Sequence, residues 1–182
     1  MVNVLNLVLF VSKPSSGDDN YIELFLDSKR YELEEGISYI VKEKRNVKGM
    51  ELFTKSIARG YRGLYITRQH PNYIAKSYET NGMEIIWLST TLGKDYMDPH
   101  NLAALLSKIR TFIEKNESSI ILLDGMEYLM INNVYLRLIR FVEQIKELTA
   151  NMNSIFLISV DEDAFEPKEM SFLERGLKPI DG

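Results

Sequence analysis

The fold class of this chain follows from one stretch of its sequence, Ile120-Ile121-Leu122-Leu123-Asp124-Gly125-Met126-Glu127-Tyr128-Leu129. Four consecutive aliphatic residues end in an aspartate. This pattern is typical of a parallel strand that is buried on both faces and places a carboxylate at the carboxyl edge of its sheet. In nucleotide-hydrolysing α/β proteins an aspartate at that place helps to hold magnesium. Such a site also needs a phosphate-binding loop and water-activating groups elsewhere in the sequence.

Strands and helices alternate along most of the chain. Strands are expected at residues 38–42, 63–67, 84–88, 120–123 and 154–160, and helices at 47–59, 71–80 and 167–175. Two further amphipathic helices are expected, one capped by Asp98 before Pro99 and one capped by Asn132 or Asn133. This alternation predicts an α/β fold in which a mostly parallel sheet is covered by helices on both faces, a three-layer sandwich. Ligands in such folds bind beyond the carboxyl ends of the strands.

Composition excludes several classes of site. The chain has 182 residues, no cysteine, two histidines and a formal net charge of -4. Disulfides, thiolate metal sites and cysteine nucleophiles are therefore excluded, and a histidine-based zinc site is not expected. An acidic chain has no general attraction for nucleic acid, so we do not expect a nucleic-acid partner. We also expect no metal or other cofactor.

The first 35 residues differ from the rest and predict an N-terminal β extension, followed by one domain over residues 36–182. Residues 2–11 are apolar, residues 13–20 have loop composition, and residues 21–26 predict a second strand before a turn at 27–29. The segment 2–11 can also be interpreted as a remnant of a signal or anchor. It is shorter than the roughly 20 residues that span a bilayer, so we expect no membrane insertion and a cytoplasmic location.

The chain resembles a known family through several motifs that recur in order. It is similar to the archaeal domain of unknown function 835 family, which itself resembles the RecA-like core of KaiC-type ATPases. The motifs are at residues 38–43, 63–71, 87–89, 122–129, 159–161 and 172–175. The resemblance implies a RecA-like sheet with the strand at 38–42 near one edge, and no established activity. It also implies add-on domains beside sensory or membrane modules.

The phosphate-binding loop that such ATPases use is degenerate here. A loop of this kind needs glycines, a lysine for the β- and γ-phosphates and a Ser or Thr for magnesium. In the segment Glu43-Lys44-Arg45-Asn46-Val47-Lys48-Gly49-Met50-Glu51 only Gly49 fits, with Met50 at the lysine position and Glu51 at the Ser/Thr position. The resemblance also implies paired glutamates where Gln69 and His70 stand. We therefore expect no hydrolysis and no enzyme activity.

Asp124, Glu127 and Arg68 remain as candidates at the sheet edge. Asp124 can be interpreted as a magnesium ligand or as a carboxylate that caps the following segment. Glu127 can be a catalytic base, a solvated side chain or the partner of an arginine. Arg68 leaves a neighbouring strand, so an ion pair with Asp124 or Glu127 would replace the lost metal by a fixed cation.

A basic cluster follows the strand at 38–42. Lys42, Lys44, Arg45 and Lys48 can hold a phosphate, a nucleotide or a nucleic-acid backbone, or they can form a solvated loop diluted by Glu43 and Glu51. The candidate ligand-binding residues are thus Lys44, Arg45, Lys48, Gly49, Arg68, Asp124 and Glu127.

Three functional hypotheses follow from these residues. The first is a non-catalytic regulatory or scaffold module that acts through protein contacts, with a partner or with itself as a homodimer joined by the N-terminal strands. The second is a sensor that binds a nucleotide or another anion without hydrolysing it. The third is an NTPase with rearranged catalytic residues. We also expect the N-terminal strands to cover the sheet edge beside residues 38–42.

Overall fold

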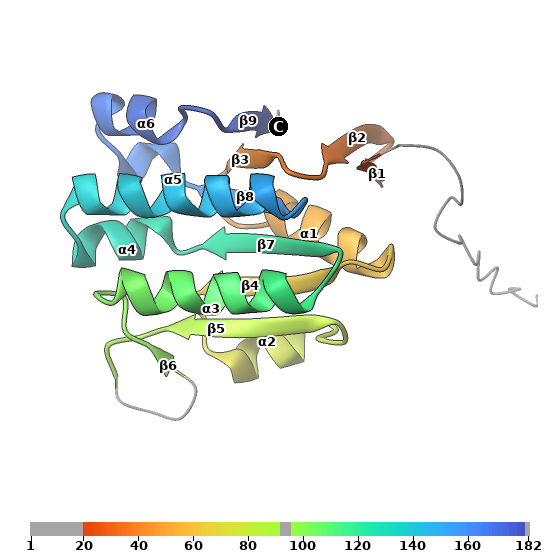
Figure 1. The fold of residues 1–182 in the computed structure, drawn as a ribbon, viewed down its shortest axis with the longest axis horizontal. Coiled ribbons are helices and arrows are strands. Elements are labelled where there is room, and N and C mark those ends of the chain that lie inside the picture. The colour runs from red at the N-terminus through yellow and green to blue at the C-terminus, as the bar shows by residue number, and fades with distance from the viewer. Residues whose placement is uncertain (1–19, 92–95, 181–182) are drawn as a thin grey trace, which may run out of the picture.

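The computed structural model describes residues 20–91 and 96–180. Within them a seven-stranded sheet has the order β6-β5-β4-β7-β8-β3-β9, and every neighbouring pair of strands is parallel (Figure 1). The strands are β3 (Ser38–Lys42), β4 (Arg62–Thr67), β5 (Met83–Leu88), β6 (Tyr96–Met97), β7 (Ser119–Asp124), β8 (Ile155–Val160) and β9 (Lys178–Ile180). The predicted parallel sheet is confirmed, and the sequence analysis missed only its two short edge strands, β6 and β9.

The central strands are apolar on both faces because helices or a hairpin cover both sides of the sheet. Alternate residues of one strand belong to two separate cores. One core receives Tyr39, Val41, Tyr65, Ile120, Leu122, Ile155 and Leu157. The other receives Ile40, Leu64, Ile66, Ile121, Leu123, Phe156 and Ile158. Burial on both faces thus explains the continuous apolar runs from which the strands were predicted.

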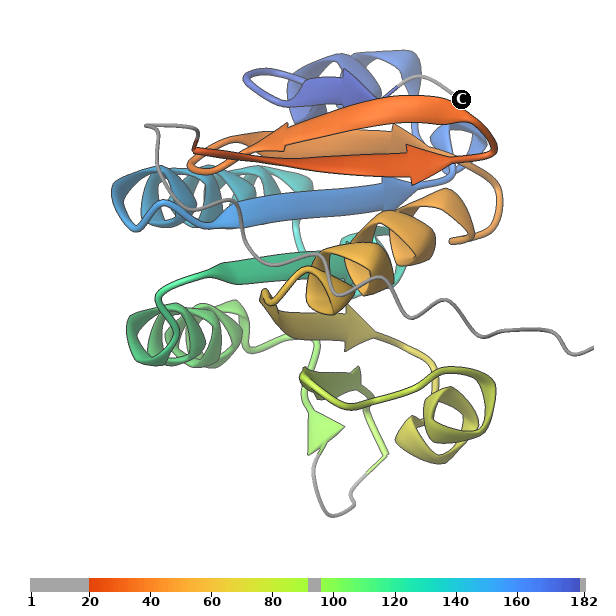
Figure 2. The same cartoon turned by 90° about the vertical axis from the view of Figure 1, so that its right-hand side faces the viewer.

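Six α-helices of the described residues form the two outer layers of the sandwich. Figure 2 shows α1 and α2 on one side of the sheet, with α3 and α5 on the other. Core residues of α4 and α6 pack with those of α3 and α5. The helices are α1 (Lys48–Ala58), α2 (Pro71–Ser77), α3 (Leu102–Lys115), α4 (Met126–Asn132), α5 (Tyr135–Asn151) and α6 (Pro167–Leu173), with a 3-10 turn, η1, at Glu162–Ala164. None of the described helices is long and apolar enough to cross a membrane.

The N-terminal extension contains an antiparallel hairpin of β1 (Tyr21–Leu26) and β2 (Lys29–Glu34). Its two-residue turn places Asp27 and Ser28 at positive φ, as a type I′ hairpin turn requires. The inner side chains of the hairpin join the core between α1 and the sheet. The hairpin does not pair with the sheet, so the expectation that residues 21–26 cover the edge beside β3 is wrong. Strand β9 lies there instead, and residues 2–11 fall outside the described residues.

Four predicted helix boundaries are wrong, and one of them is the end of α2, which lies at Ser77 rather than at residue 80. Asp98 does not cap α3, because its carboxylate accepts the N–H of His100 in a local turn and Asn101 accepts the N–H of Ala104. Asn132 and Asn133 do not cap α5, because both donate to carbonyl groups at the end of α4, a helix that was not predicted. Val134 stands at the N-cap of α5 without a side-chain cap. The last helix, α6, ends at Leu173 rather than at residue 175.

Candidate functional site

A carboxylate lies inside the loop between β3 and α1, where the sequence analysis expected a degenerate phosphate-binding loop. Glu43 follows β3, and its Oε2 accepts the backbone N–H groups of Val47 at 3.0 Å and Lys48 at 2.8 Å. Its Oε1 accepts the N–H of Gly49 at 2.9 Å and the hydroxyl of Ser159 at 2.8 Å. Converging backbone N–H groups at a helix start are what a bound phosphate would use. In this chain they serve its own glutamate.

Residue 49 has to be glycine because the side chains of Glu43 and Asn46 lie close to its Cα. A Cβ at residue 49 would lie 2.7 Å from Asn46 Oδ1 and 3.0 Å from Glu43 Oε1, closer than side chains pack. The one glycine that fits the degenerate loop therefore makes room for Glu43 and Asn46. Its presence does not require a phosphate.

Asp124 binds hydroxyl groups of the neighbouring strand. Tyr65 Oη donates to Asp124 Oδ2 at 2.7 Å, and Thr67 Oγ1 lies 3.3 Å from the same oxygen. Asn46 Nδ2 donates to Tyr65 Oη at 3.3 Å. Burial, and next the charge and hydrogen bond of Asp124, raise the pKa of the Tyr65 hydroxyl well above its usual value, so Tyr65 stays a donor. The capping interpretation of Asp124 is wrong, because α4 has Gly125 at its N-cap and no side-chain cap.

Arg68 and Glu127 do not pair with each other. The Arg68 guanidinium lies 5.3 Å from the centre of the Tyr128 ring, and no carboxylate of the described residues pairs with it. Glu127 Oε1 accepts the N–H of Asp161 at 2.8 Å and so joins α4 to the end of β8. The predicted ion pair of Arg68 with Asp124 or Glu127 is therefore wrong. The exposed arginine contacts an aromatic face instead.

These residues still surround a common pocket. It has a volume of about 400 Å³ at the carboxyl ends of β4 and β7, and three candidates predicted from the sequence line it. The lining residues are Thr67, Arg68, Gln69, Asp124, Gly125, Glu127 and Tyr128. One cation and two carboxylates therefore face the same space.

The predicted basic cluster is dispersed among acidic partners. Lys44 pairs with Asp163 at 2.8 Å, and Lys42 pairs with Glu162 at 3.1 Å and with Glu174. The Lys48 ammonium lies 5.8 Å from the centre of the Tyr31 ring. Arg45 is exposed to solvent. Carboxylates of η1 and of Glu174, which directly follows α6, thus neutralise two of the four cations that the sequence placed together.

The residues that fill the site carry no clear signal in the sequence. Glu43 looks there like a charge that only dilutes the basic cluster, and nothing local assigns a role to Tyr65, Asn46 or Ser159. The available signal was a glutamate placed directly before a degenerate loop that lacks its lysine. In residues 20–91 and 96–180 no three His, Asp or Glu side chains are grouped so that they could hold a metal ion.

The comparisons with known proteins agree with this architecture. Residues 41–177 match a family described as "Protein of unknown function (DUF835)". The chain belongs to the DUF835 family. This DUF835 chain is also similar to the crystal structure of the flagellar accessory protein FlaH from Methanocaldococcus jannaschii, with a TM-score of 0.54 and 16% sequence identity. The similarity covers 79% of this chain and 69% of FlaH, and at this identity it shows the shared fold. The comparison with curated proteins gave no match.

Proposed function

We propose that this DUF835 chain is a non-catalytic regulatory or scaffold module that acts through protein contacts. The observation that carries the proposal is the Glu43 carboxylate, which accepts three backbone N–H groups of the loop and the Ser159 hydroxyl. A phosphate would have to displace a group that is covalently part of the chain and already forms charge-assisted hydrogen bonds. It would also approach a like charge at short range.

Three side chains at the positions of the missing catalytic groups have structural roles: Met50, Glu51 and His70. Met50 is buried in the core beneath the hairpin, and Glu51 pairs with Lys55 one helical turn away. His70 accepts the N–H of Asn72 and caps α2. These contacts support a fold that is kept for its shape, since Met50 packs in the core, Glu51 pairs within its own helix and His70 caps α2.

The proposal is tested by nucleotide binding and turnover. Calorimetric titration with Mg-ATP, ADP, a cyclic dinucleotide and a nucleic-acid oligomer is expected to give no heat of binding. ATP and GTP turnover is expected to be absent. Steady turnover that Asp124→Ala abolishes would show that the third hypothesis, an NTPase with rearranged residues, is correct.

Magnesium provides an independent test of Asp124. Thermal melting of the wild type is expected to be the same with and without magnesium, because Asp124 already binds Tyr65 and Thr67. Asp124→Ala is expected to cost about 1 kcal/mol for each hydrogen bond lost, whether or not the metal is present. A magnesium-dependent rise in the melting temperature of the wild type, absent from Asp124→Ala, would establish a metal site.

A ligand sensor is the second candidate, and the pocket beside Arg68 favours it. Arg68 lines this pocket without a carboxylate partner among the described residues. Inorganic phosphate and nucleotides are the probes. Binding that Arg68→Gln removes and Lys76→Gln, an exposed change on α2, leaves intact would favour the sensor over the scaffold. No binding by the wild type would leave the scaffold as the better proposal.

A further inference from the structure

We propose that the turn between α4 and α5 is a docking surface for an acidic, aliphatic segment of a partner protein. Three aliphatic side chains within six residues are mostly exposed there: Ile131 at 79%, Val134 at 68% and Leu136 at 58%. Scattered apolar residues are normal on a protein surface, but three in one turn form a local apolar patch. We call Ile131, Val134 and Leu136, with Arg137 and Arg140, the turn surface.

The two arginines beside the apolar patch determine the charge that a partner should carry. Arg137 and Arg140 are exposed, lie one helical turn apart on α5, and have no carboxylate partner in the part of the chain that the structure describes. Arg140 is also one turn from Leu136, so apolar and cationic side chains share one face of the helix. Aliphatic groups beside two available guanidinium groups are complementary to a segment that combines aliphatic residues with Asp or Glu.

The nearby acidic side chains are already engaged and do not neutralise the arginines. Asp98 binds the N–H and the ring of His100. Glu166 and Glu169 cap α6 by reciprocal hydrogen bonds with each other's backbone. Farther along α5, Glu143 pairs with Lys146 at 2.8 Å. The first turn of α5 carries no acidic residue. The turn surface therefore keeps its positive charge.

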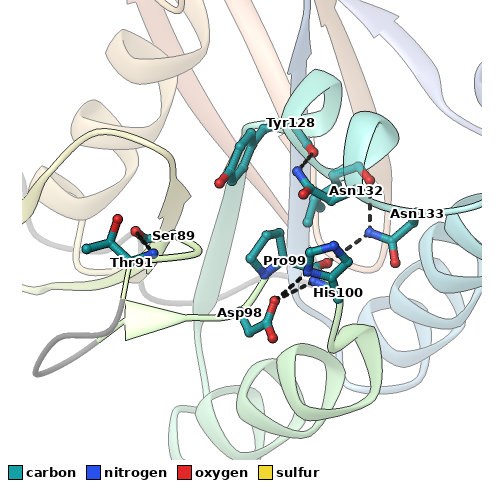
Figure 3. A network of polar contacts seen from close by, with 9 residues as sticks. Ser89, Thr91, Asp98, Pro99, His100, Tyr128, Asn132 and Asn133 are labelled. Carbon is teal, nitrogen blue, oxygen red and sulfur yellow. Dashed lines mark hydrogen bonds and ion pairs between the residues drawn. The ribbon is translucent and has the colours of Figure 1, made fainter.

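Hydrogen bonds brace the turn, which favours binding because little order has to be gained. Asn133 donates to the carbonyl of Pro99 at 2.9 Å and to that of Leu129 at 2.8 Å, so the loop before α3 braces it (Figure 3). Asn132 donates to the Tyr128 carbonyl at 2.7 Å. Tyr135 donates to the Glu169 carbonyl and joins the start of α5 to α6. The exposed side chains thus project from a fixed backbone.

A protein segment fits this surface better than a membrane does. Helices that bind the membrane interface carry Trp, Phe or Leu along a continuous apolar face, opposite a face rich in Lys and Arg. The turn surface has three aliphatic residues, no aromatic residue and two arginines. The proposal rests on the proposed function only in its general form, that the module acts through protein contacts. It does not depend on the closure of the loop by Glu43.

The test selects short random peptides displayed on phage against the full chain. Expected binders are rich in Asp or Glu together with Leu, Ile or Val, and they weaken as salt is raised. A triple variant (Ile131→Ser, Val134→Ser, Leu136→Ser) and a charge variant (Arg137→Glu, Arg140→Glu) are each expected to weaken a synthetic copy of the best peptide at least about tenfold. Two controls, Tyr73→Ser and Arg59→Glu, alter an exposed apolar residue and an exposed arginine elsewhere and are expected to leave its affinity unchanged.

Several outcomes would overturn the proposal. One is that the selected peptides lack acidic residues. A second is that the peptides bind both variants as well as the wild type, while circular dichroism shows that both variants are folded. Another is binding to phosphatidylglycerol vesicles that the same variants abolish, which would assign the surface to a membrane. Self-association that the same variants abolish would assign it to a second copy of the chain. The nucleotide titrations described above test separately whether Glu43 keeps phosphate out of the loop. A failure of the proposed function can therefore be distinguished from a failure of the docking proposal.

Discussion

At the scale of single residues, the site is organised by side chains that satisfy one another. Glu43 occupies the loop N–H groups, and Asp124 accepts hydroxyl groups from β4. Buried or half-buried polar groups are costly when they are left unpaired, so each pair stabilises the carboxyl edge of the sheet. The groups that an active NTPase would keep available for a nucleotide are used here within the chain.

Replacement of Glu43 is expected to destabilise the fold measurably. Glu43→Ala leaves the N–H groups of Val47, Lys48 and Gly49 without their acceptor, which we expect to cost about 2–3 kcal/mol of unfolding free energy. Glu43→Gln keeps one acceptor oxygen and is expected to cost less. Urea unfolding measures both, with Glu51→Ala as the control, since its surface pair is worth about 0.5 kcal/mol or less. Equal costs for Glu43→Ala and Glu51→Ala would contradict the closed loop.

Tyr65 predicts a dependence of stability on alkaline pH. Its pKa is raised in the folded chain, first by burial and then by Asp124, from a usual value of 10.0. A raised folded pKa gives stability that is complete below the unfolded pKa and is lost as pH rises above it. The unfolding free energy of the wild type should therefore fall more steeply above about pH 10 than that of Tyr65→Phe. Parallel curves for the two proteins in urea unfolding would show that Tyr65 is not the cause.

At the scale of elements, helix starts are where local patterns and the observed structure disagree. Asp98-Pro99 has the composition of a helix start, yet a turn closes on His100 and Asn101 caps α3. The Asn132-Asn133 pair ends α4 and braces the loop before α3 rather than opening α5. Capping residues have several accessible partners, and neighbouring loops decide which of them is used.

The cap of α3 can be measured directly. Asn101→Ala removes the bond to the N–H of Ala104 and is expected to cost about 1 kcal/mol of unfolding free energy. Asp98→Ala is expected to cost less, since Asp98 bonds only to His100 within its own turn and caps no helix. Chemical denaturation of the two variants in parallel gives the comparison. A larger loss for Asp98→Ala than for Asn101→Ala would restore Asp98 as the cap.

At the scale of the whole molecule, the positions of the hairpin and of β9 decide which strand edge the N-terminal residues could pair with. Strand β9 takes the place beside β3 that was expected for the N-terminal strands, and the hairpin covers α1 instead. Among the described residues β1 pairs only with β2, so one edge of β1 has no partner strand. The boundary at residues 35–36 and a homodimer joined by the N-terminal strands remain predictions.

The dimer is tested by deleting residues 1–20. Residues 2–11 are apolar and β-prone, and an edge strand with no partner can receive a strand from its own chain or from a second chain. We expect light scattering to give the mass of a dimer for the wild type and that of a monomer for the deletion. A wild type that is monomeric at high protein concentration would contradict the dimer and leave pairing within one chain.

The sequence by itself determined the layered α/β fold and the position of Asp124 at a strand end. Runs such as Ile120 to Leu123 report burial on both faces, which is a local property that any compact arrangement must respect. The sequence also shows that the residues after β3 do not form a phosphate-binding loop, because Met50 and Glu51 cannot replace a lysine and a hydroxyl.

Only the tertiary structure decided what occupies the degenerate site. Glu43 meets Ser159 across a separation of 116 residues, and Tyr65 meets Asp124 across 59. These contacts depend on the order of the strands and on the path of the loop after β3. Neither property has a periodic signature in the sequence, because periodicity reports which face of an element is buried and not which distant side chain lies against it.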